Sequence, residues 1–312
     1  MSLQNIVICG GGVLGSQIAF QLAYCELNVT VWLRSEESIK RTKQKISEIE
    51  KMYLKDLEIF TKNPKYYIYG IIGNKTNLTS EEIELYKNRI KNSANKLKYT
   101  TDIKEAVKNA DLIIESISEV KEEKNKFYKN LSNLLEEKTI LATNTSTFIP
   151  SMFANLTGRP KKFLSMHFAN IIHKANTLEI MGHSETDKDV FNEIVKFAEK
   201  INMIPLPIYK EQPGYILNSL LIPWLHAAGT LWANDIADPE TIDKTWEIAT
   251  KSPVGPMRTF DIIGLKTIYN ININKKESEL DPSTKKFILK IKEMIDNGKT
   301  GIESGEGFYK YK

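Results

Sequence analysis

Near the start of the chain, the segment Ile6-Val7-Ile8-Cys9-Gly10-Gly11-Gly12-Val13-Leu14-Gly15 carries the clearest evidence for the fold class. Its apolar beginning predicts a buried strand, and glycines at the spacing G-x-G-x-x-G follow directly, before a helical pattern. Gly10 permits a tight turn, Gly12 lets the backbone approach a pyrophosphate, and Gly15 lets the helix pack close to the strand. A second apolar run returns at 29–33. This context predicts a βαβ unit that binds a dinucleotide at the helix N-terminus.

Outward from this unit, short β-branched runs alternate with amphipathic helical patterns through the first two thirds of the chain. Such alternation is typical of a mostly parallel sheet with helices on its faces. The predicted strands cover residues 6–9, 29–33, 112–117, 139–142, 163–168, 177–181 and 203–208. We therefore expect an α/β fold with a Rossmann-type dinucleotide-binding domain over residues 1–207.

A long connection at about 35–98 predicts a helical hairpin inserted into this domain. Apolar residues recur at helical intervals in both of its halves. Thr79 and Glu82 have the spacing of a capping box, which marks the start of the second helix. The tip of the hairpin is expected near 63–77.

The remaining residues, 208–312, are predicted to form an all-α domain that contributes to substrate binding. A long apolar helix extends from about Gly214 to Trp232, and another begins at Asp238-Pro239, with Asp238 as its N-cap. Further helices are expected after Asp261 and over 283–297. A helix that is apolar on most faces needs covering on most faces, so we also expect a homodimer formed through this domain.

The composition excludes several function classes. The 43 basic and 39 acidic residues are interspersed, so no basic block predicts a nucleic-acid partner. The longest apolar stretch contains Asn218, Ser219 and His226, which argues against a membrane span. Two cysteines, Cys9 and Cys25, are too few for a disulfide framework, and the first residues are expected to open a strand rather than to form a leader peptide. We therefore expect a cytoplasmic protein acting on a small molecule.

The second strand suggests which dinucleotide is bound. An acid that holds the adenosine ribose is expected near Leu33, but Arg34-Ser35 follows instead. A guanidinium and a hydroxyl suit a 2′-phosphate, which favours NADP(H) over NAD(H). In the alternative interpretation, Arg34 stacks on the adenine, and Glu36 or Glu37 belongs only to the helix N-terminus.

Polar residues at the carboxyl ends of predicted strands form the candidate catalytic site. His167 is the natural base for a hydroxyl proton, and Glu179 on the next strand can accept from its other ring nitrogen. Ser146 and Asn218 can donate hydrogen bonds to a substrate oxygen. Taken singly, each of the four has an ordinary structural explanation: a core histidine, a structural carboxylate, a helix cap or a polar group on a helix.

Together these segments resemble the short-chain L-3-hydroxyacyl-CoA dehydrogenase family, and within it the branch that contains diketoreductase and λ-crystallin-type gulonate dehydrogenase. The resemblance spans nearly the whole chain. Its marks, in chain order, are the glycine turn, the segment from Glu119 to Lys124, Asn144-Thr145-Ser146, His167-Phe168-Ala169-Asn170, Pro213-Gly214-Tyr215 with Asn218, Gly255-Pro256 and Gly305-Glu306-Gly307-Phe308-Tyr309.

The resemblance implies an NAD(P)-dependent oxidoreductase acting on a CH–OH group, in which His167 is the general acid/base and Glu179 orients it. Ser146 and Asn218 are then donors to the substrate, and Asn170 a further substrate contact.

The same resemblance places Glu119, Lys124 and Asn144 near the nicotinamide half of the cofactor. Val13 and Leu14, between the glycines, are expected to contact the cofactor as well.

Departures from the family pattern leave alternatives open. Leu33 and Arg34 replace the ribose-binding acid, although the family as a whole favours NAD(H). Ser219 stands where hydroxyacyl-CoA enzymes carry Arg. Hairpin lysines suit a CoA phosphate or are merely solvated, so a CoA thioester of fatty acid metabolism and a free β-keto acid or ester are both candidates. A gulonate or carnitine dehydrogenase, or a non-catalytic crystallin-like dinucleotide binder, remains an alternative.

Overall fold

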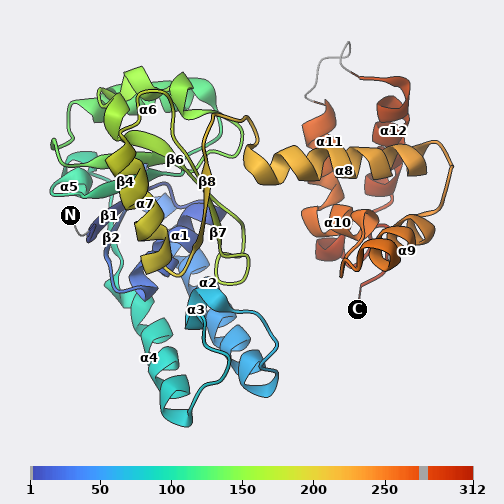
Figure 1. The fold of residues 1–312 in the computed structure, drawn as a ribbon, viewed down its shortest axis with the longest axis horizontal. Helices are drawn as coiled ribbons and strands as arrows, with labels where there is room; N and C mark the ends of the chain where they lie inside the picture. The colour runs from blue at the N-terminus through green and yellow to red at the C-terminus, as the bar shows by residue number, and fades with distance from the viewer. Residues whose placement is uncertain (1–2, 274–279, 312) are drawn as a thin grey trace. The chain divides into compact units, whose positions relative to one another are not determined.

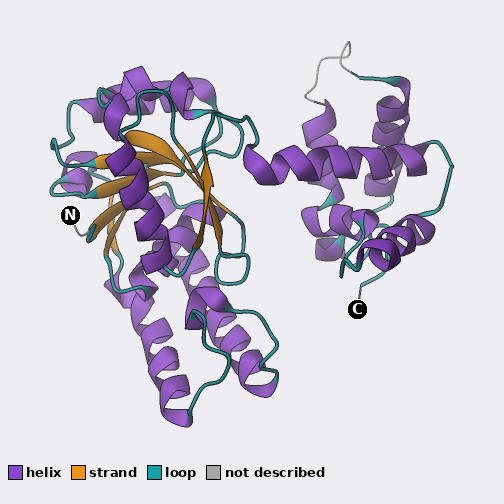
Figure 2. Ribbon diagram, viewed as in Figure 1, coloured by secondary structure: helices purple, strands orange, loops and turns teal. Residues whose placement is uncertain are grey.

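The computed structural model describes residues 3–273 and 280–311. The chain divides into two compact units, Met1–Ile216 and Leu217–Lys312. The first is an α/β unit and the second is helical, as the ribbons in Figure 1 and Figure 2 show. The expected combination of a Rossmann-type sheet and an all-α C-terminal domain is confirmed, whereas the boundary predicted at 207/208 stays a prediction.

The first unit is built on an eight-stranded sheet of order β3-β2-β1-β4-β5-β6-β7-β8. The strands are β1 (Asn5–Cys9), β2 (Asn28–Trp32), β3 (Lys98–Thr100), β4 (Leu112–Glu115), β5 (Ile140–Thr143), β6 (Phe163–Phe168), β7 (Thr177–Met181) and β8 (Ile204–Ile208). All neighbouring pairs are parallel except β6 and β7. Seven strands were predicted; β3 was missed because it has three residues and no apolar alternation.

The order of the strands indicates where along the sheet a ligand is expected to bind. The chain passes from β1 outward to β2 and β3, then returns to pair β4 with the other side of β1. An open α/β sheet forms a crevice where the strand order reverses, beyond the carboxyl ends of the strands. Here that point lies between Cys9 at the end of β1 and Glu115 at the end of β4.

Helices cover both faces of the sheet. They are α1 (Val13–Tyr24), α2 (Glu36–Lys62), α3 (Tyr69–Ile72), α4 (Ser80–Lys96), α5 (Ile103–Val107), α6 (Lys121–Ser132) and α7 (Lys188–Lys200), with 3₁₀ turns η1 (Pro150–Met152), η2 (Ala154–Thr157) and η3 (Pro160–Lys162). The predicted hairpin is formed by α2 and α4. Thr79 and Glu82 make the reciprocal hydrogen bonds of a capping box at the start of α4.

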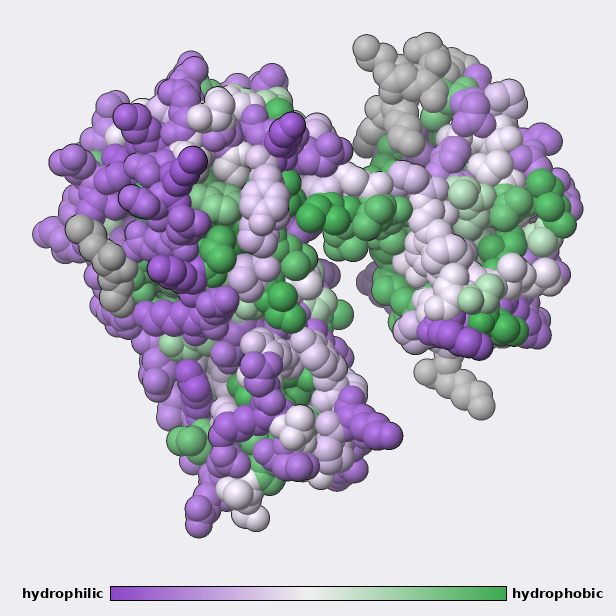
Figure 3. Space-filling model, viewed as in Figure 1, coloured by the Kyte–Doolittle hydropathy of each residue, from purple (hydrophilic) through white to green (hydrophobic). Residues whose placement is uncertain are grey.

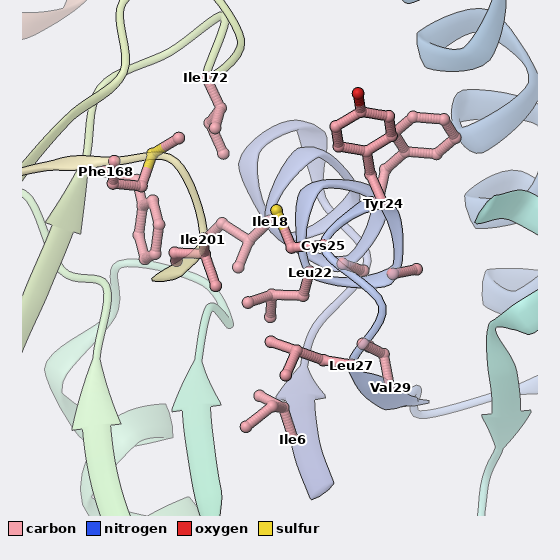
Figure 4. Packing of buried hydrophobic residues seen from close by; sticks show 14 of the residues in the cluster. Ile6, Ile18, Leu22, Tyr24, Cys25, Leu27, Val29, Phe168, Ile172 and Ile201 are labelled. Atoms are coloured by element: carbon pink, nitrogen blue, oxygen red, sulfur yellow. The ribbon is translucent and has the colours of Figure 1, made fainter. Parts of the chain in front are cut away.

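The core lies on both sides of the sheet because alternate residues of a strand point to opposite faces. Ile6 and Ile8 of β1 join the cluster around α1, whereas Val7 and Cys9 join the cluster on the other face. Figure 4 shows the first cluster, in which Ile18 of α1 and neighbouring apolar side chains gather beside β1. Burial on both faces explains why β1 is a continuous apolar run.

The second unit contains five helices among the described residues, together with the last 3₁₀ turn. They are α8 (Tyr215–Ala233, whose first two residues belong to the first unit), α9 (Pro239–Thr250), α10 (Pro256–Ile263), α11 (Leu265–Ile273), α12 (Pro282–Asp296) and η5 (Ile302–Ser304). Asp238 caps α9 by accepting from Thr241 N, as predicted. The helix expected after Asp261 was only partly right: Asp261 lies inside α10, and Gly264 at φ +92° separates α10 from α11.

The C-terminal tail is fastened to this unit by Asp261, which is fully buried. One carboxylate oxygen accepts from Phe308 N at 2.8 Å, and the other accepts from Tyr309 N at 3.0 Å and from the Tyr311 hydroxyl at 2.7 Å. A Cβ on Gly307 would lie 2.0 Å from an Asp261 oxygen. Glycine is therefore required where the tail crosses the carboxylate.

Apolar side chains remain on the surface of α8. Leu220 is 68% exposed, and Ile222 on the same helix is also exposed. Figure 3 shows hydrophobic residues gathered along this helix. Within the described parts of the chain, 3–273 and 280–311, no helix combines the length and the hydropathy that a bilayer crossing needs.

Candidate active site

The glycine turn follows β1 and leads into α1. Gly10 has φ +118°, and a Cβ there would lie 2.3 Å from Ser116 O, while a Cβ on Gly15 would lie 2.2 Å from Gly10 O. Both glycines therefore permit close backbone contacts. A Cβ on Gly12 would meet nothing within 4 Å. Space beside Gly12 is what a pyrophosphate approaching the α1 N-terminus requires, so these residues fit a dinucleotide.

Gly11 has a steric role that sequence reasoning missed. A Cβ there would lie 2.0 Å from Thr42 Oγ1 on α2, so the first hairpin helix packs directly against the turn. The Gly11 carbonyl also accepts from the Ser16 hydroxyl at 3.2 Å and from Lys45 Nζ at 3.5 Å. The position between the two fingerprint glycines carried no local signal for this contact, because Thr42 is distant in sequence.

A cavity of about 360 Å³ opens beside the turn, between the ends of β2 and β4 and the first turns of α2. Its lining includes Arg34, Arg41 and Lys45. The Arg34 side chain is 72% exposed, and its guanidinium lies 3.4 Å from the Glu123 carboxylate. Leu33 is buried and no carboxylate replaces it at the end of β2. The cavity is therefore basic where an NAD site usually presents an acid.

Ser35, next to Arg34 in the chain, has a structural role. It is the N-cap of α2, and its hydroxyl accepts from Ser38 N at 3.3 Å. A hydroxyl that accepts one hydrogen bond can still donate another, so capping leaves Ser35 able to contact a phosphate.

The acid–base pair is built by the antiparallel strands β6 and β7. His167 and Glu179 are directly opposite in the register, which puts their side chains on one face. His167 Nδ1 lies 2.8 Å from Glu179 Oε2, and both residues are buried. The second carboxylate oxygen, Oε1, accepts from Ile216 N at 2.8 Å. Glu179 therefore fixes the ring orientation and leaves Nε2 as the nitrogen for proton exchange.

Tyr215 completes the surroundings of the imidazole. Its ring stacks on His167 with centroids 4.5 Å apart and an angle of 26°. Tyr215 has φ +58° and follows Gly214 at φ +78°, so the chain turns sharply as it enters α8. Burial raises the pKa of the Tyr215 phenol, which keeps the ring neutral beside the histidine. Sequence reasoning placed Tyr215 in a motif but assigned it no role.

The loop that carries Ser146 is organised by Glu119. Glu119 Oε1 accepts from Ser146 N and Thr147 N, each at 3.1 Å, and from the Thr145 hydroxyl. Its other oxygen lies 3.3 Å from Lys124 Nζ. Glu119 thus holds the loop, Lys124 pairs with Glu119, and Ser146 is exposed. Their predicted place beside the nicotinamide stays a prediction.

A buried carboxylate that sequence reasoning missed lies beneath this loop. Glu115 at the end of β4 is fully buried and accepts from Lys124 Nζ at 2.6 Å, Ile117 N at 2.8 Å, Thr143 Oγ1 at 2.8 Å and the Tyr128 hydroxyl. Paired and fully hydrogen-bonded, such a group is tolerated in a core. The available signal was an acidic residue inside an otherwise apolar run.

Asn144 joins the ends of three strands. Its Nδ2 donates to Ser116 Oγ at 3.3 Å, after β4, and its Oδ1 accepts from Phe168 N at 3.1 Å, at the end of β6. Gly10 packs closely against Ser116, where a Cβ would clash. Contacts therefore run from the glycine turn through Ser116 and Asn144 to Phe168, the residue that follows His167. The acid–base pair and the dinucleotide turn therefore share one edge of the sheet.

Two further predicted residues lie apart from the pair in the chain. Asn170 follows β6, is exposed, and accepts from Gln17 Nε2 at 2.7 Å. Asn218 lies on α8 in the second compact unit. The substrate contacts predicted for Asn170 and Asn218 stay predictions, as do the roles of Val13 and Leu14.

Comparison with known families gives matches over nearly the whole chain. A family model described as "3-hydroxyacyl-CoA dehydrogenase, NAD binding domain" matches residues 5–212. A second, described as "3-hydroxyacyl-CoA dehydrogenase, C-terminal domain", matches residues 214–311.

Individual relatives agree with these matches. The chain is 29% identical to the mitochondrial hydroxyacyl-coenzyme A dehydrogenase of Rattus norvegicus, over 99% of this chain and 92% of that protein. It is 32% identical to a probable 3-hydroxybutyryl-CoA dehydrogenase of Deinococcus radiodurans, over 69% of this chain and 77% of that protein. A solved diketoreductase, described as a dual catalyst of dicarbonyl compounds, is 38% identical with a TM-score of 0.85 and full coverage of both chains.

Proposed function

Because the chain belongs to the 3-hydroxyacyl-CoA dehydrogenase family, we propose that it transfers a hydride between a nicotinamide dinucleotide and a 3-hydroxy or 3-oxo substrate. The observation that carries the proposal is the His167–Glu179 hydrogen bond at the sheet edge that also holds the glycine turn. The nicotinamide ring, when the cofactor is bound, supplies or accepts the hydride.

The protein's own residues handle the proton and the oxygen charge. In the reductive direction, His167 Nε2 delivers a proton to the developing alkoxide, and Glu179 stabilises the imidazolium before transfer. The Ser146 hydroxyl, on the loop held by Glu119, donates to the same oxygen. In the oxidative direction His167 takes the hydroxyl proton. Asn218 is proposed as a second donor from α8.

The test is steady-state kinetics of His167→Ala. We expect the turnover number to fall by about 10²- to 10⁴-fold, which is the usual effect of losing a positioned acid/base. The dissociation constant of the dinucleotide should stay within about twofold, because His167 contacts none of the glycine turn. His183→Gln, on the loop after β7, is the matched control and should retain wild-type turnover. Near-wild-type turnover in His167→Ala would overturn the assignment.

The substrate is proposed to carry a carbonyl at C1 and a keto or hydroxyl group at C3. A CoA thioester is supported by the family, and a free β-dicarbonyl compound by the 38% identity with diketoreductase. Initial rates with acetoacetyl-CoA, a free β-keto ester, gulonate and carnitine distinguish the candidates. No oxidation of NADH or NADPH with any 3-oxo compound would favour a non-catalytic dinucleotide binder instead.

For the cofactor, we propose a preference for NADP(H) within the NAD-binding family. The absence of an acid at Leu33 and the exposed Arg34 guanidinium support a 2′-phosphate site, with Arg41 and Lys45 on the same cavity. Arg34→Glu should weaken NADPH binding at least about tenfold and leave NADH binding within about threefold in a fluorescence titration. Tighter binding of NADH than NADPH by the wild type would refute the preference.

A homodimer through the helical unit is proposed from its apolar surface. Ile222 is exposed and lines a largely apolar cavity of about 380 Å³ with Phe260 and Phe287. Sedimentation should give twice the mass of one chain, and Ile222→Asp should shift the protein toward monomer. A monomeric wild type would exclude the dimer. The cytoplasmic location and the assignment to fatty acid metabolism stay predictions.

A further inference from the structure

Gln17 connects the cofactor-binding helix with the loop that carries Asn170. It lies on α1 two residues after Gly15, and it is 7% exposed. Its Oε1 accepts from Ile171 N at 2.8 Å and from Ile172 N at 3.3 Å, and its Nε2 donates to Asn170 Oδ1 at 2.7 Å. One side chain therefore holds three consecutive residues of the β6–β7 loop.

The backbone fixes which way both amides point. A backbone N–H can only donate, so the Gln17 atom that faces Ile171 N and Ile172 N must be its oxygen. The Gln17 nitrogen then faces Asn170, and the Asn170 atom opposite that nitrogen must also be an oxygen. Ile171 N lies 3.1 Å from the same Asn170 oxygen and supports this orientation. The Asn170 NH₂ group is consequently the end of the amide that points away from the clamp.

The conformation of the loop depends on this support. Ile171 has φ +59°, a region that β-branched residues rarely adopt. The Gln17 oxygen binds the N–H of this strained residue. Farther along the loop, His173 Nε2 lies 2.6 Å from Asp56 Oδ2 on α2, and its carbonyl accepts from Gly70 N at 3.0 Å. The loop is thus anchored at both ends, while Asn170 itself is exposed.

We propose that Gln17 is a positioning residue that presents the Asn170 NH₂ group to an oxygen acceptor on the substrate. In the proposed function, on which this inference rests, that acceptor is the C1 oxygen of the 3-oxo or 3-hydroxy compound, as a thioester carbonyl or a carboxylate. The loop then selects compounds with an acceptor at C1 and disfavours those with a donor there.

The first test is Gln17→Glu, which keeps the acceptor for Ile171 N and Ile172 N but cannot donate to Asn170. Two oxygens then oppose each other, and the Asn170 amide must turn or move away. We expect the KM for the 3-oxo substrate to rise about tenfold, with kcat within about threefold and the dinucleotide dissociation constant within about twofold. Gln44→Glu, exposed on α2, adds the same charge and should leave all three unchanged.

A double-mutant cycle separates positioning from a general structural effect. If Gln17 acts through Asn170, Asn170→Ala raises KM by a similar factor, and adding Gln17→Glu to it causes no further rise. An unchanged KM in Gln17→Glu, or fully additive effects of the two changes, would overturn the inference.

Binding without turnover keeps this inference separate from the proposed function. 3-Hydroxybutyryl-CoA or free 3-hydroxybutyrate with the reduced cofactor forms a pair that cannot react, and calorimetry gives its dissociation constant. Weaker binding to Gln17→Glu supports the clamp even if catalysis fails, and equal binding to the wild type and the variant refutes it. Amide hydrogen exchange at Ile171 should stay slow in Gln17→Glu and become fast in Gln17→Met; equal rates in both would contradict the clamp.

Discussion

Gly12 and Gly15, in the same turn, should respond differently to an added methyl group. Gly12 has φ −65° and ψ −171°, which alanine adopts without strain, and its Cβ would meet nothing within 4 Å. Gly15 also lies in an ordinary helical conformation, but its Cβ would lie 2.2 Å from Gly10 O, a distance that forces the backbone to move.

The expected magnitudes follow from this difference. Gly12→Ala makes the unfolded chain less flexible, which stabilises the fold by about 0.4–1 kcal/mol. Alanine is a poorer helix N-cap than glycine, which offsets this gain, so the free energy of unfolding should change by under about 1 kcal/mol. In Gly15→Ala, overpacking should cost about 1–3 kcal/mol. The added methyl of Gly12→Ala occupies the space that the pyrophosphate needs, so dinucleotide affinity should fall at least about tenfold.

Urea denaturation and a fluorescence titration with NADPH and NADH measure the two quantities for each variant. For each variant, the change in the free energy of unfolding is compared with the change in dinucleotide affinity. Wild-type affinity in Gly12→Ala would show that the phosphates do not approach this residue. A stability loss in Gly12→Ala equal to that of Gly15→Ala would show that the space beside Gly12 is not free in solution.

Three further predictions concern buried charges. Lys124→Met should lower the free energy of unfolding, measured by urea denaturation, by about 3–5 kcal/mol, because it removes one partner of a buried ion pair with Glu115. Exposed Lys126→Met should change it by under about 0.5 kcal/mol, and similar losses in the two variants would contradict the role of the pair. Burial lowers the pKa of the His173 imidazole below its usual value of 6.5, despite the hydrogen bond with Asp56. As the pH drops through 6.5, the unfolded chain therefore binds a proton at this residue before the folded chain does, and the free energy of unfolding should fall. Denaturation at pH 7.5 and 5.5 should show a larger loss for the wild type than for His173→Gln, and equal losses would refute this account. Asp261→Asn should release the tail and increase cleavage near residues 303–310 in limited proteolysis, whereas Asp296→Asn on the surface of α12 should not; an unchanged cleavage pattern in Asp261→Asn would be inconsistent with the tail contacts.

Local patterns in the sequence were sufficient for most of the framework. The apolar runs of β1 and β6, the capping box at Thr79 and the Asp238 cap each depend on residues close together in the chain. The short edge strand β3 has too little pattern of its own and is stabilised by pairing with β2. The break at Gly264 was missed because helical residues flank it on both sides.

The residues of the candidate site also differ in how far local sequence predicts them. His167 and Glu179 were accessible because each is a polar residue in an apolar strand and the two strands are consecutive. The partners of Gln17 are more than 150 residues away, so no local pattern indicates its role. Glu115 is intermediate: its position in an apolar run is unusual, but its four donors come from two strand ends and a helix that only the folded chain brings together.

The Glu115 cluster has a consequence for how this chain diverges from its relatives. Lys124, Tyr128 and Thr143 are matched to one carboxylate, so losing any one of them in an ancestor leaves the others mismatched, while exchanging all of them for apolar residues does not. We therefore expect these residues to be inherited together or lost together. Descendants that retain only part of it should be rare among functional sequences, even where the surface around them has changed freely.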